Sequence, residues 1–376
     1  LLMVGAAETI AIVGAEAIAN IKAAGRAGAK PDWRESREEP LEDRGPYGPD
    51  GFGIHMSAIA HRIDAPIYYY ALFETARRAA LTETKERYRE RMASLWEDFA
   101  GVAANNAFAF VRDAPTGDEI VTPTPGNPML TTPYTKAMVA RDGVNLGAAV
   151  ILSTYGRAKA AGITDVTFLH AHDQATEPTP LERARLDRAE AQARVLESVG
   201  RDADLYDVYS CFPVVPLEAQ RILGLADGAP MTLTGGLPFF GGPGNNYSLH
   251  GIAEAHAAVR GTDKVAVVYA NGGVSNKHAA GRYSGTAPER VELHDGGAVA
   301  PSKAVHTDPD PAGRLVSYTV THKRGEPTGV LLVGETDNGA RFYARGDVEA
   351  ADRFLQGDPL GEDVRTKTKQ GQNLLV

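Results

Sequence analysis

Residues 235–251 read GGLPFFGGPGNNYSLHG, a stretch crowded with glycine, proline and asparagine. Glycine adopts backbone conformations that other residues avoid, and it lets other groups approach the main chain closely. From Tyr247 the chain continues as YSLHGIAEAHAAVRG, whose apolar spacing predicts a helix. Glycine N–H groups just before a helix form a ready site for an anion or an oxyanion. We therefore expect a turn beside a ligand site here.

Strands and helices alternate outward from this turn. The runs 204–215 (DLYDVYSCFPVV) and 265–273 (VAVVYANGG) are short and apolar, which predicts strands before and after the helix. Residues 165–173 (DVTFLHAHD) predict another strand, and residues 147–162 predict a strand followed by the start of a helix. The alternation indicates a layered α/β fold.

The first part of the chain combines one strand with a helical region. Thr9–Val13 predicts a buried strand that ends at Gly14. Residues 30–53 are polar and rich in proline, glycine and charge, which predicts a loop. Between residues 58 and 112, apolar residues recur at three- and four-residue spacing, which predicts helices.

A further helix is predicted over residues 179–200. Thr179 suits the N-cap, Pro180 suits the first helical position, and Glu182 completes a capping box. Gly200 follows the last periodic residue, where glycine commonly ends a helix. The pattern predicts one continuous helix.

The composition changes near residue 300. Residues 314–322, 328–336 and 340–346 have a partly alternating apolar pattern, and glycine-containing turns join them. They predict three strands of a small antiparallel β-domain.

Composition narrows the classes of partner and compartment. The 376 residues carry a net charge of −9 without a block rich in Lys and Arg, so nucleic acid and anionic membranes are not expected as partners. The single cysteine, Cys211, excludes an internal disulfide framework and a cysteine zinc site. It fits a reducing compartment, and we expect a cytoplasmic protein.

The most apolar stretch, residues 1–19, does not read as a membrane span. Glu8 and Glu16 interrupt it, and no basic segment precedes it as in a signal peptide. The chain opens inside apolar sequence without an initiator Met, which is expected of a piece of a longer chain.

Motifs for other chemistries are weak or missing. The glycine-rich stretch lacks the dinucleotide fingerprint, the P-loop and the Gly-x-Ser-x-Gly elbow. His170 and His172 alternate before Asp173, as two metal ligands on one strand face would. No third ligand stands at recognisable spacing, so we expect a polar strand end and no metal site.

Three isolated side chains remain as candidates. His250 stands four residues before Glu254 on the predicted helix, which favours a structural histidine over a catalytic one. Cys211 lies in an apolar run and is expected to behave as a small buried hydrophobe. Lys277 and His278 follow a glycine pair, and we expect them in a solvated polar loop.

Taken in order, several segments resemble the thiolase superfamily, specifically the sterol-carrier-type thiolases and the related actinobacterial thiolase-like proteins. The matching segments, which span roughly residues 8–285, are IVGAEA (12–17), PYTKAMVARDGVNLGAAVIL (133–152), LHAHDQATEP (169–178), YDVYSCFPVV (206–215), GGLPFFGGPG (235–244) and YANGGVSNKHAAGRYS (269–284). Each motif is weak alone, but their order and spacing carry the resemblance.

The resemblance implies an active-site loop without its usual catalytic residues. The family's nucleophilic cysteine would lie upstream of Leu1 in this chain. Its Gly-His-Pro histidine corresponds to Gly242, and its water-positioning asparagine or histidine corresponds to Tyr209. Its acid/base cysteine corresponds to Ala270, or to Asn271.

Cys211 matches a non-catalytic cysteine of the family, so the resemblance leaves the catalytic residues unknown. Cys211, His250 and His278 are the weak substitutes in this chain. Backbone donors for a thioester oxygen or CoA are expected from one set of residues: Gly241, Gly242, Gly244, Asn271, Gly272 and Gly273.

The implied architecture is a thiolase fold, layered α/β/α/β/α, with an extra small antiparallel, barrel-like β-domain at the C-terminus. Residues 1–150 correspond to the second part of the N-terminal half, including a helical loop domain at about 20–140. Residues 151–285 correspond to the C-terminal half, 286–313 to a linker, and 314–376 to the β-domain.

Three functions follow as alternatives. The first is a catalytically degenerate thiolase-like protein that binds an acyl-CoA-like ligand or a protein partner. The second is an active acyl-CoA acyltransferase of the acetyl-CoA acetyltransferase or 3-ketoacyl-CoA thiolase type. The third is a scaffold subunit that recruits a protein through its C-terminal β-domain. No covalently bound cofactor is expected. Thiolases are usually dimers, but part of their interface would precede Leu1, so monomer and dimer both stay open.

Overall fold

A computed structural model describes residues 1–32 and 49–376. Most of the loop predicted over residues 30–53 lies outside the described residues. The α-helices are α1 (Ile18–Arg26), α2 (Pro49–Phe52), α3 (Met56–Ala60), α4 (Pro66–Ala80), α5 (Lys85–Asn105), α6 (Gly117–Val121), α7 (Tyr155–Ala160), α8 (Glu190–Val199), α9 (Val214–Leu223), α10 (Tyr247–Val259) and α11 (Val348–Gln356). Short 3₁₀ turns are η1 (Lys136–Met138), η2 (Pro180–Glu182) and η3 (Gly244–Asn246).

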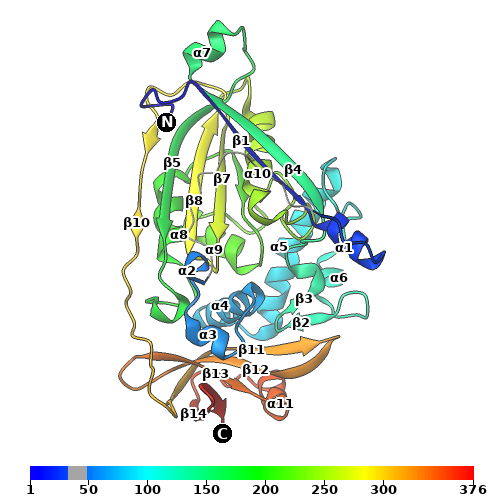
Figure 1. Cartoon of the computed structure of the whole chain (residues 1–376), viewed down its shortest axis with the longest axis vertical. Coiled ribbons are helices and arrows are strands. Elements are labelled where there is room, and N and C mark those ends of the chain that lie inside the picture. The colour runs from blue at the N-terminus through cyan, green and yellow to red at the C-terminus, as the bar shows by residue number, and fades with distance from the viewer. Residues whose placement is uncertain (33–48) are drawn as a thin grey trace.

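The strands are β1 (Thr9–Ala17), β2 (Met129–Thr131), β3 (Tyr134–Thr135), β4 (Asn145–Ser153), β5 (Phe168–Thr176), β6 (Leu205–Val208), β7 (Val265–Gly272), β8 (Lys277–Ser284), β9 (Glu292–Leu293), β10 (Gly297–Ala298), β11 (Ala312–Lys323), β12 (Glu326–Glu335), β13 (Arg341–Gly346), β14 (Asp363–Lys369) and β15 (Gln372–Leu375). Figure 1 shows three tiers: a sheet with its helices at the top, a helical middle, and a barrel at the foot.

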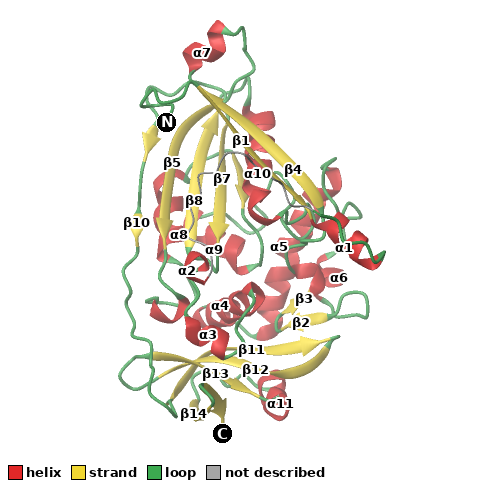
Figure 2. Ribbon diagram, in the orientation of Figure 1, coloured by secondary structure: helices red, strands yellow, loops and turns green. Residues whose placement is uncertain are grey.

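The upper sheet has the strand order β10-β5-β8-β7-β6, with β9 also paired to β5 (Figure 2). Residues on β7 alternate between its two faces, as a strand requires. Ala266 and Val268 pack with Ala255 and Val259 of α10, whereas Val267 and its like-facing neighbours join the main core with α8 and α9. Because α10 also packs against β4, the layers run β1–β4 ribbon, α10, sheet, then α8 and α9. The predicted α/β layering is therefore confirmed.

The β1–β4 ribbon differs from its prediction in burial. Thr9–Val13 does form a strand, which continues to Ala17 and pairs antiparallel with β4 over its whole length. The expected burial is wrong: Val13 is 71% exposed and Ile151 is 74% exposed. Among the described residues β1 has a single strand neighbour, so one face of the ribbon packs toward α10 and the other stays uncovered.

The predicted helix over 179–200 and the predicted strand over 204–215 are both shorter in the structure. The capping box of Thr179 and Glu182 forms, but it caps only the short turn η2, and the next helix starts at Glu190. The main chain leaves the helix at Arg183, whose backbone is extended and whose guanidinium is buried. The predicted strand 204–215 ends at Val208, and Pro213, whose fixed φ suits a helix start, precedes α9.

The C-terminal region is a closed five-stranded barrel. Strands pair in the order β12-β13-β15-β14-β11, and the β11–β12 pairing closes the ring. The predicted barrel-like β-domain and its first three strands are confirmed; α11, β14 and β15 were not anticipated. One pair, β13–β15, is parallel rather than antiparallel. The stretch predicted as a linker carries β9 and β10, which run along the edge strand β5.

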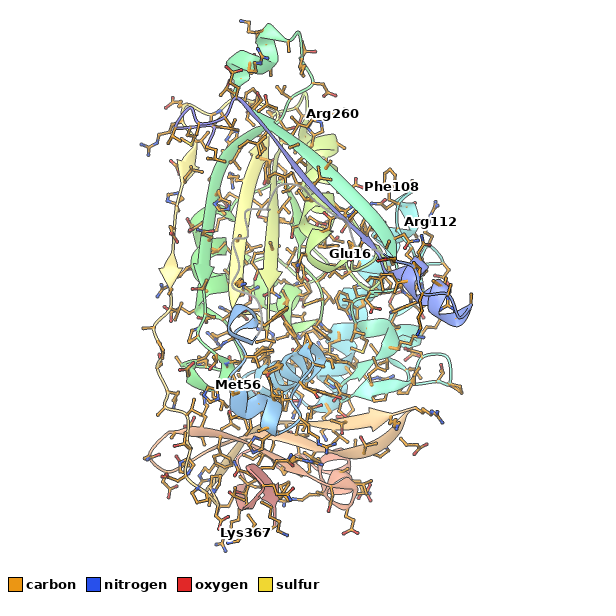
Figure 3. The ribbon with its side chains drawn as sticks, viewed as in Figure 1. Glu16, Met56, Phe108, Arg112, Arg260 and Lys367 are labelled. Atoms are coloured by element: carbon orange, nitrogen blue, oxygen red, sulfur yellow. The ribbon has the colours of Figure 1, made fainter. Side chains whose placement is uncertain are left out.

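The barrel is docked tightly on the helical tier. Leu331, Val333 and Tyr343 from β12 and β13 belong to the main core together with α4. Arg78 of α4 bonds Asp358 at 2.8 Å, and Lys85 of α5 donates to the carbonyl of Phe354 at 2.8 Å. Figure 3 shows Met56, on α3, just above the barrel, and Lys367 of β14 at its far end.

The glycines at the start of the opening stretch serve close packing. Gly235 has φ +105°, and a Cβ there would lie 2.5 Å from the Cα of Ala103 on α5. Gly236 has φ +81°, and its Cβ would meet the Phe99 ring at 2.5 Å. Only glycine combines a positive φ with such an approach. This part of the loop therefore packs directly against α5.

Candidate functional site

A cleft of about 1040 Å³ opens where the sheet meets the helical tier. One part of its wall comes from the sheet: the ends of β5 and β7, the start of β8 and the segment after β6. Other parts come from the starts of α4 and α10 and from the segment that contains β10. Of the residues singled out in the sequence, those lining it are Tyr209, Cys211, Gly244, Ala270, Asn271, Gly272, Gly273, Lys277 and His278. The fold thus brings together segments more than sixty residues apart.

The buried floor of the cleft joins Tyr70, Cys211 and Asn271. The Asn271 amide nitrogen donates to the Tyr70 hydroxyl at 2.8 Å and to the Cys211 sulfur at 3.8 Å. The Tyr70 ring stacks on Phe212 with centroids 4.5 Å apart. Burial raises the pKa of the Cys211 thiol to about 12, although hydrogen bonds from its neighbours oppose the shift. At neutral pH this sulfur is a thiol and not a nucleophilic thiolate.

His278 is buried, contrary to the expected solvated loop. The backbone turns at Gly273 and Ser275, then starts β8 at Lys277, which carries the imidazole inward. Nδ1 lies 2.6 Å from the Tyr269 hydroxyl, and Nε2 lies 3.1 Å from the Ser275 carbonyl. Burial, and secondarily the charge of Arg183, lowers the pKa of His278 to about 3. The imidazole is neutral, and both of its nitrogens are engaged.

Of the expected backbone donors, some line the cleft and two do not. The lining ones are Gly244, Asn271, Gly272 and Gly273. Gly241 and Gly242 do not line the cleft, and the Gly242 N–H donates to the Arg141 carbonyl at 2.8 Å. Gly244 does line it, but its N–H donates to the Gly242 carbonyl at 2.9 Å. Gly244 also abuts the Glu16 carboxylate at the end of the ribbon, labelled in Figure 3. The N–H groups of Gly242 and Gly244 are therefore engaged within the protein.

His250 lies outside the cleft lining. Its Nε2 is 3.3 Å from the Asn246 amide, and its ring packs edge-on against Phe240 at 5.1 Å. Glu254 accepts a hydrogen bond from Asn106, the residue that follows α5. These contacts are those of a structural histidine.

His170 and His172 belong to no cluster of metal-ligating side chains in the part of the chain that the structure describes. His170 bonds the Thr286 carbonyl at 2.7 Å. Within residues 1–32 and 49–376, no cluster of three or more His, Cys, Asp or Glu side chains is arranged to hold a metal ion. The same residues include no helix with the length and hydrophobicity needed to cross a membrane.

Tyr70 lines the cleft, and Arg183 donates hydrogen bonds to the turn at Val274 and Ser275 in its wall. The sequence singled out neither residue. Tyr70 stands in an apolar helical run, IYYYALF, where one tyrosine looks like the next. Arg183 stands in a charged run that resembles a solvated helix face. The sequence feature that could have drawn attention to Arg183 is its place directly after Glu182 of the capping box.

The comparisons with known proteins point to one family. No protein-family profile and no curated sequence matches the chain. Among solved structures, a monomeric SCP2-thiolase like protein type 1 from Mycobacterium smegmatis matches with 33% identity and a TM-score of 0.77, covering 84% of this chain and 74% of that one.

More remote matches are a thiolase from Ascaris suum, solved in complex with coenzyme A, and the dimeric peroxisomal thiolase of Saccharomyces cerevisiae. Each is 15% identical with a TM-score of 0.48 and covers 75% of this chain, with 73% and 70% of the respective thiolase covered. The Mycobacterium smegmatis match, at one-third identity over most of both chains, decides the assignment. This chain belongs to the SCP2-thiolase-like proteins within the thiolase superfamily.

Proposed function

We propose that this protein binds CoA or a short acyl-CoA thioester in the cleft and does not catalyse the thiolase reaction. The proposal rests on one position: by the resemblance, the family's catalytic histidine corresponds to Gly242, which does not line the cleft and whose N–H donates to the Arg141 carbonyl. The cleft of about 1040 Å³ is large enough for a ligand, while this position carries no imidazole.

The remaining candidate groups are poorly suited to the chemistry. Thiolysis and Claisen condensation need a thiolate, a base and oxyanion donors together. Cys211 is held as a thiol by burial, and His278 is held neutral with both nitrogens engaged. Losing general acid–base help alone costs roughly 10²–10⁴ in rate. The residues of the cleft therefore favour binding over turnover.

The cleft has the features that a thioester ligand requires. Tyr70, Phe212 and Ile67 supply apolar and aromatic surface for an acyl chain or a pantetheine arm. Ser248 lies in the first turn of α10, Asn245 lies in the preceding turn η3, and Lys277 is an exposed cation among the lining residues. These polar groups suit amide and phosphate groups of the ligand.

Binding is tested by titrating acetyl-CoA and CoA into the protein in a calorimeter. Replacing Ala270 by Phe puts a ring into the cleft and is expected to weaken binding at least about tenfold, or 1.4 kcal/mol. Ala160→Phe, on the exposed helix α7, adds the same ring away from the cleft and should leave the affinity unchanged. Equal affinities for all three proteins would contradict binding in this cleft.

The active-enzyme alternative is separated by measuring acetoacetyl-CoA thiolysis with the intact protein. We expect no turnover above the uncatalysed rate, because base and thiolate are both missing. Turnover that disappears in Cys211→Ala, His250→Ala or His278→Ala would overturn the proposal in favour of an active acyltransferase.

A further inference from the structure

The wall of the cleft ends in a tight turn between β7 and β8. Gly272 and Gly273 line the cleft, and the backbone then passes through two positive φ angles, +60° at Gly273 and +58° at Ser275. Ser275 is not a glycine, and such a conformation persists only when its surroundings hold it. The question is which residues do so.

Arg183 holds this turn from behind. Its guanidinium donates to the carbonyls of Val274 and Ser275 at 2.9 and 2.7 Å, and to that of Pro178 at 3.2 Å. It lies 4.9 Å from the centre of the Phe73 ring and is only 3% exposed. Its hydrogen bonds to the described residues all go to main-chain carbonyls, so its task is to fix the backbone.

The same turn is linked to the floor of the cleft. The Ser275 carbonyl that accepts from Arg183 also accepts from His278 Nε2, whose ring is anchored on Tyr269. The Gly273 carbonyl accepts from the Tyr70 hydroxyl at 3.4 Å. Movement of the turn would therefore disturb the groups around Cys211.

Arg341 of the barrel strand β13 continues the chain of contacts. Its guanidinium donates to the carbonyls of Arg183 and Ala184 at 2.6 and 3.2 Å, and its Nε pairs with Glu335 at 3.1 Å. Its side chain is 5% exposed. The barrel thus fixes the main chain at Arg183 and Ala184, from which the Arg183 side chain extends to the turn.

We infer that Arg183 is the positioning residue for the cleft wall and that Arg341 couples the C-terminal barrel to it, which makes the barrel an internal support of the cleft. The inference deepens the proposed function, since it concerns the same cleft, but it is tested without any CoA ligand. Cys211 is the only cysteine of the chain and lies in the floor, so its reaction with a maleimide reports on the wall.

Arg183→Gln is expected to speed the maleimide reaction on the order of tenfold, because the turn loses two hydrogen bonds from a charged donor. Arg183→Lys keeps the positive charge and can donate to one of the two carbonyls. The Cys211 thiol should therefore react more slowly in this variant than in Arg183→Gln. Arg341→Gln should speed the reaction about threefold, and should add nothing once Arg183 is Gln, because it acts through Arg183.

Two controls separate positioning from general loss of stability. Arg78→Gln breaks another contact with the barrel region, the partly buried ion pair with Asp358, and should leave the rate unchanged. Wild type in urea, brought to the same free energy of unfolding as each variant, gives the rate expected from global opening alone. If Arg183→Gln does not fold, Arg183→Lys and Arg341→Gln carry the same test.

The inference is overturned if the Arg183 variants match wild type at equal stability, if Arg78→Gln speeds the thiol equally, or if the Arg183 and Arg341 effects add in full. Calorimetry with CoA on the same proteins keeps the two ideas apart. Wild type that fails to bind CoA sinks the proposed function alone, while the maleimide rates still decide the role of the two arginines.

Discussion

Replacing Glu74 by Ala is expected to lower the free energy of unfolding by on the order of 4 kcal/mol. Glu74 of α4 is 1% exposed and accepts hydrogen bonds from the hydroxyls of Tyr88 and Tyr134 and from the N–H of Val214. These donors come from α5, β3 and the start of α9, so one carboxyl joins four elements of the helical tier. Alanine would leave the Tyr88 hydroxyl and the Val214 N–H buried without a partner, and each costs roughly 1–3 kcal/mol. The Tyr134 hydroxyl would keep the Tyr70 carbonyl as an acceptor at 3.0 Å.

The matched control is Glu74→Gln, compared by urea unfolding at pH 6. Burial raises the pKa of Glu74 to about 7, so the carboxyl is largely protonated at this pH in the native state. Glutamine reproduces that neutral form: its oxygen can accept from Tyr134 and Val214 while its amide donates to Tyr88. Its cost should stay below about 1.5 kcal/mol. Equal losses for Ala and Gln would show that packing, and not the hydrogen bonds, is what Glu74 contributes.

The fold could be predicted from the sequence wherever local pattern and tertiary packing agree. The helix over residues 247–259 and the strands of 265–272 and 312–346 follow from apolar spacing and turn residues, and they form as expected. The helix predicted over 179–200 forms only as the turn η2 and the helix α8, because a capping box has no information about where Arg183 finds its hydrogen-bond partners. Those carbonyls lie about ninety residues further along the chain.

The candidate site was predictable in part. The turn at Gly273, which lines the cleft, is visible in the sequence, because its positive φ favours glycine. The burial of His278 was not, since it depends on where β8 starts after the turn and on the contact with Tyr269 of the paired strand β7. Likewise the N–H of Gly242 looked free, but its acceptor is the Arg141 carbonyl on a separate loop.

The C-terminal β-domain was a candidate surface for recruiting a protein. In the structure, one face of β12 and β13 packs into the main core, and Ser317 of β11 donates to the Leu72 carbonyl of α4 at 2.5 Å. These contacts occupy the part of the barrel that faces the helical tier. They favour a supporting role for the barrel within the chain over recruitment through that face.

His278→Gln is expected to make the protein less sensitive to acid. Burial lowers the pKa of His278 to about 3 in the native state, against 6.5 in the unfolded chain. Between these values the unfolded state binds more protons, so wild type loses stability as the pH falls below about 6.5. At pH 4.5 this linkage costs wild type about 2–3 kcal/mol relative to neutral pH, and the Gln variant escapes the cost.

The measurement is the gap in unfolding free energy between wild type and His278→Gln, followed by urea unfolding from pH 7 to pH 4.5. Glu74 works in the opposite direction over this range, because its raised pKa stabilises the native state as the pH falls. Both proteins keep Glu74, so its contribution cancels in the gap. We expect the gap to shrink toward low pH and then reverse. A constant gap would mean that His278 titrates in the folded protein as it does in the unfolded chain. Such an imidazole would be free to take a proton near neutral pH, and it would return a general base to the wall of the cleft.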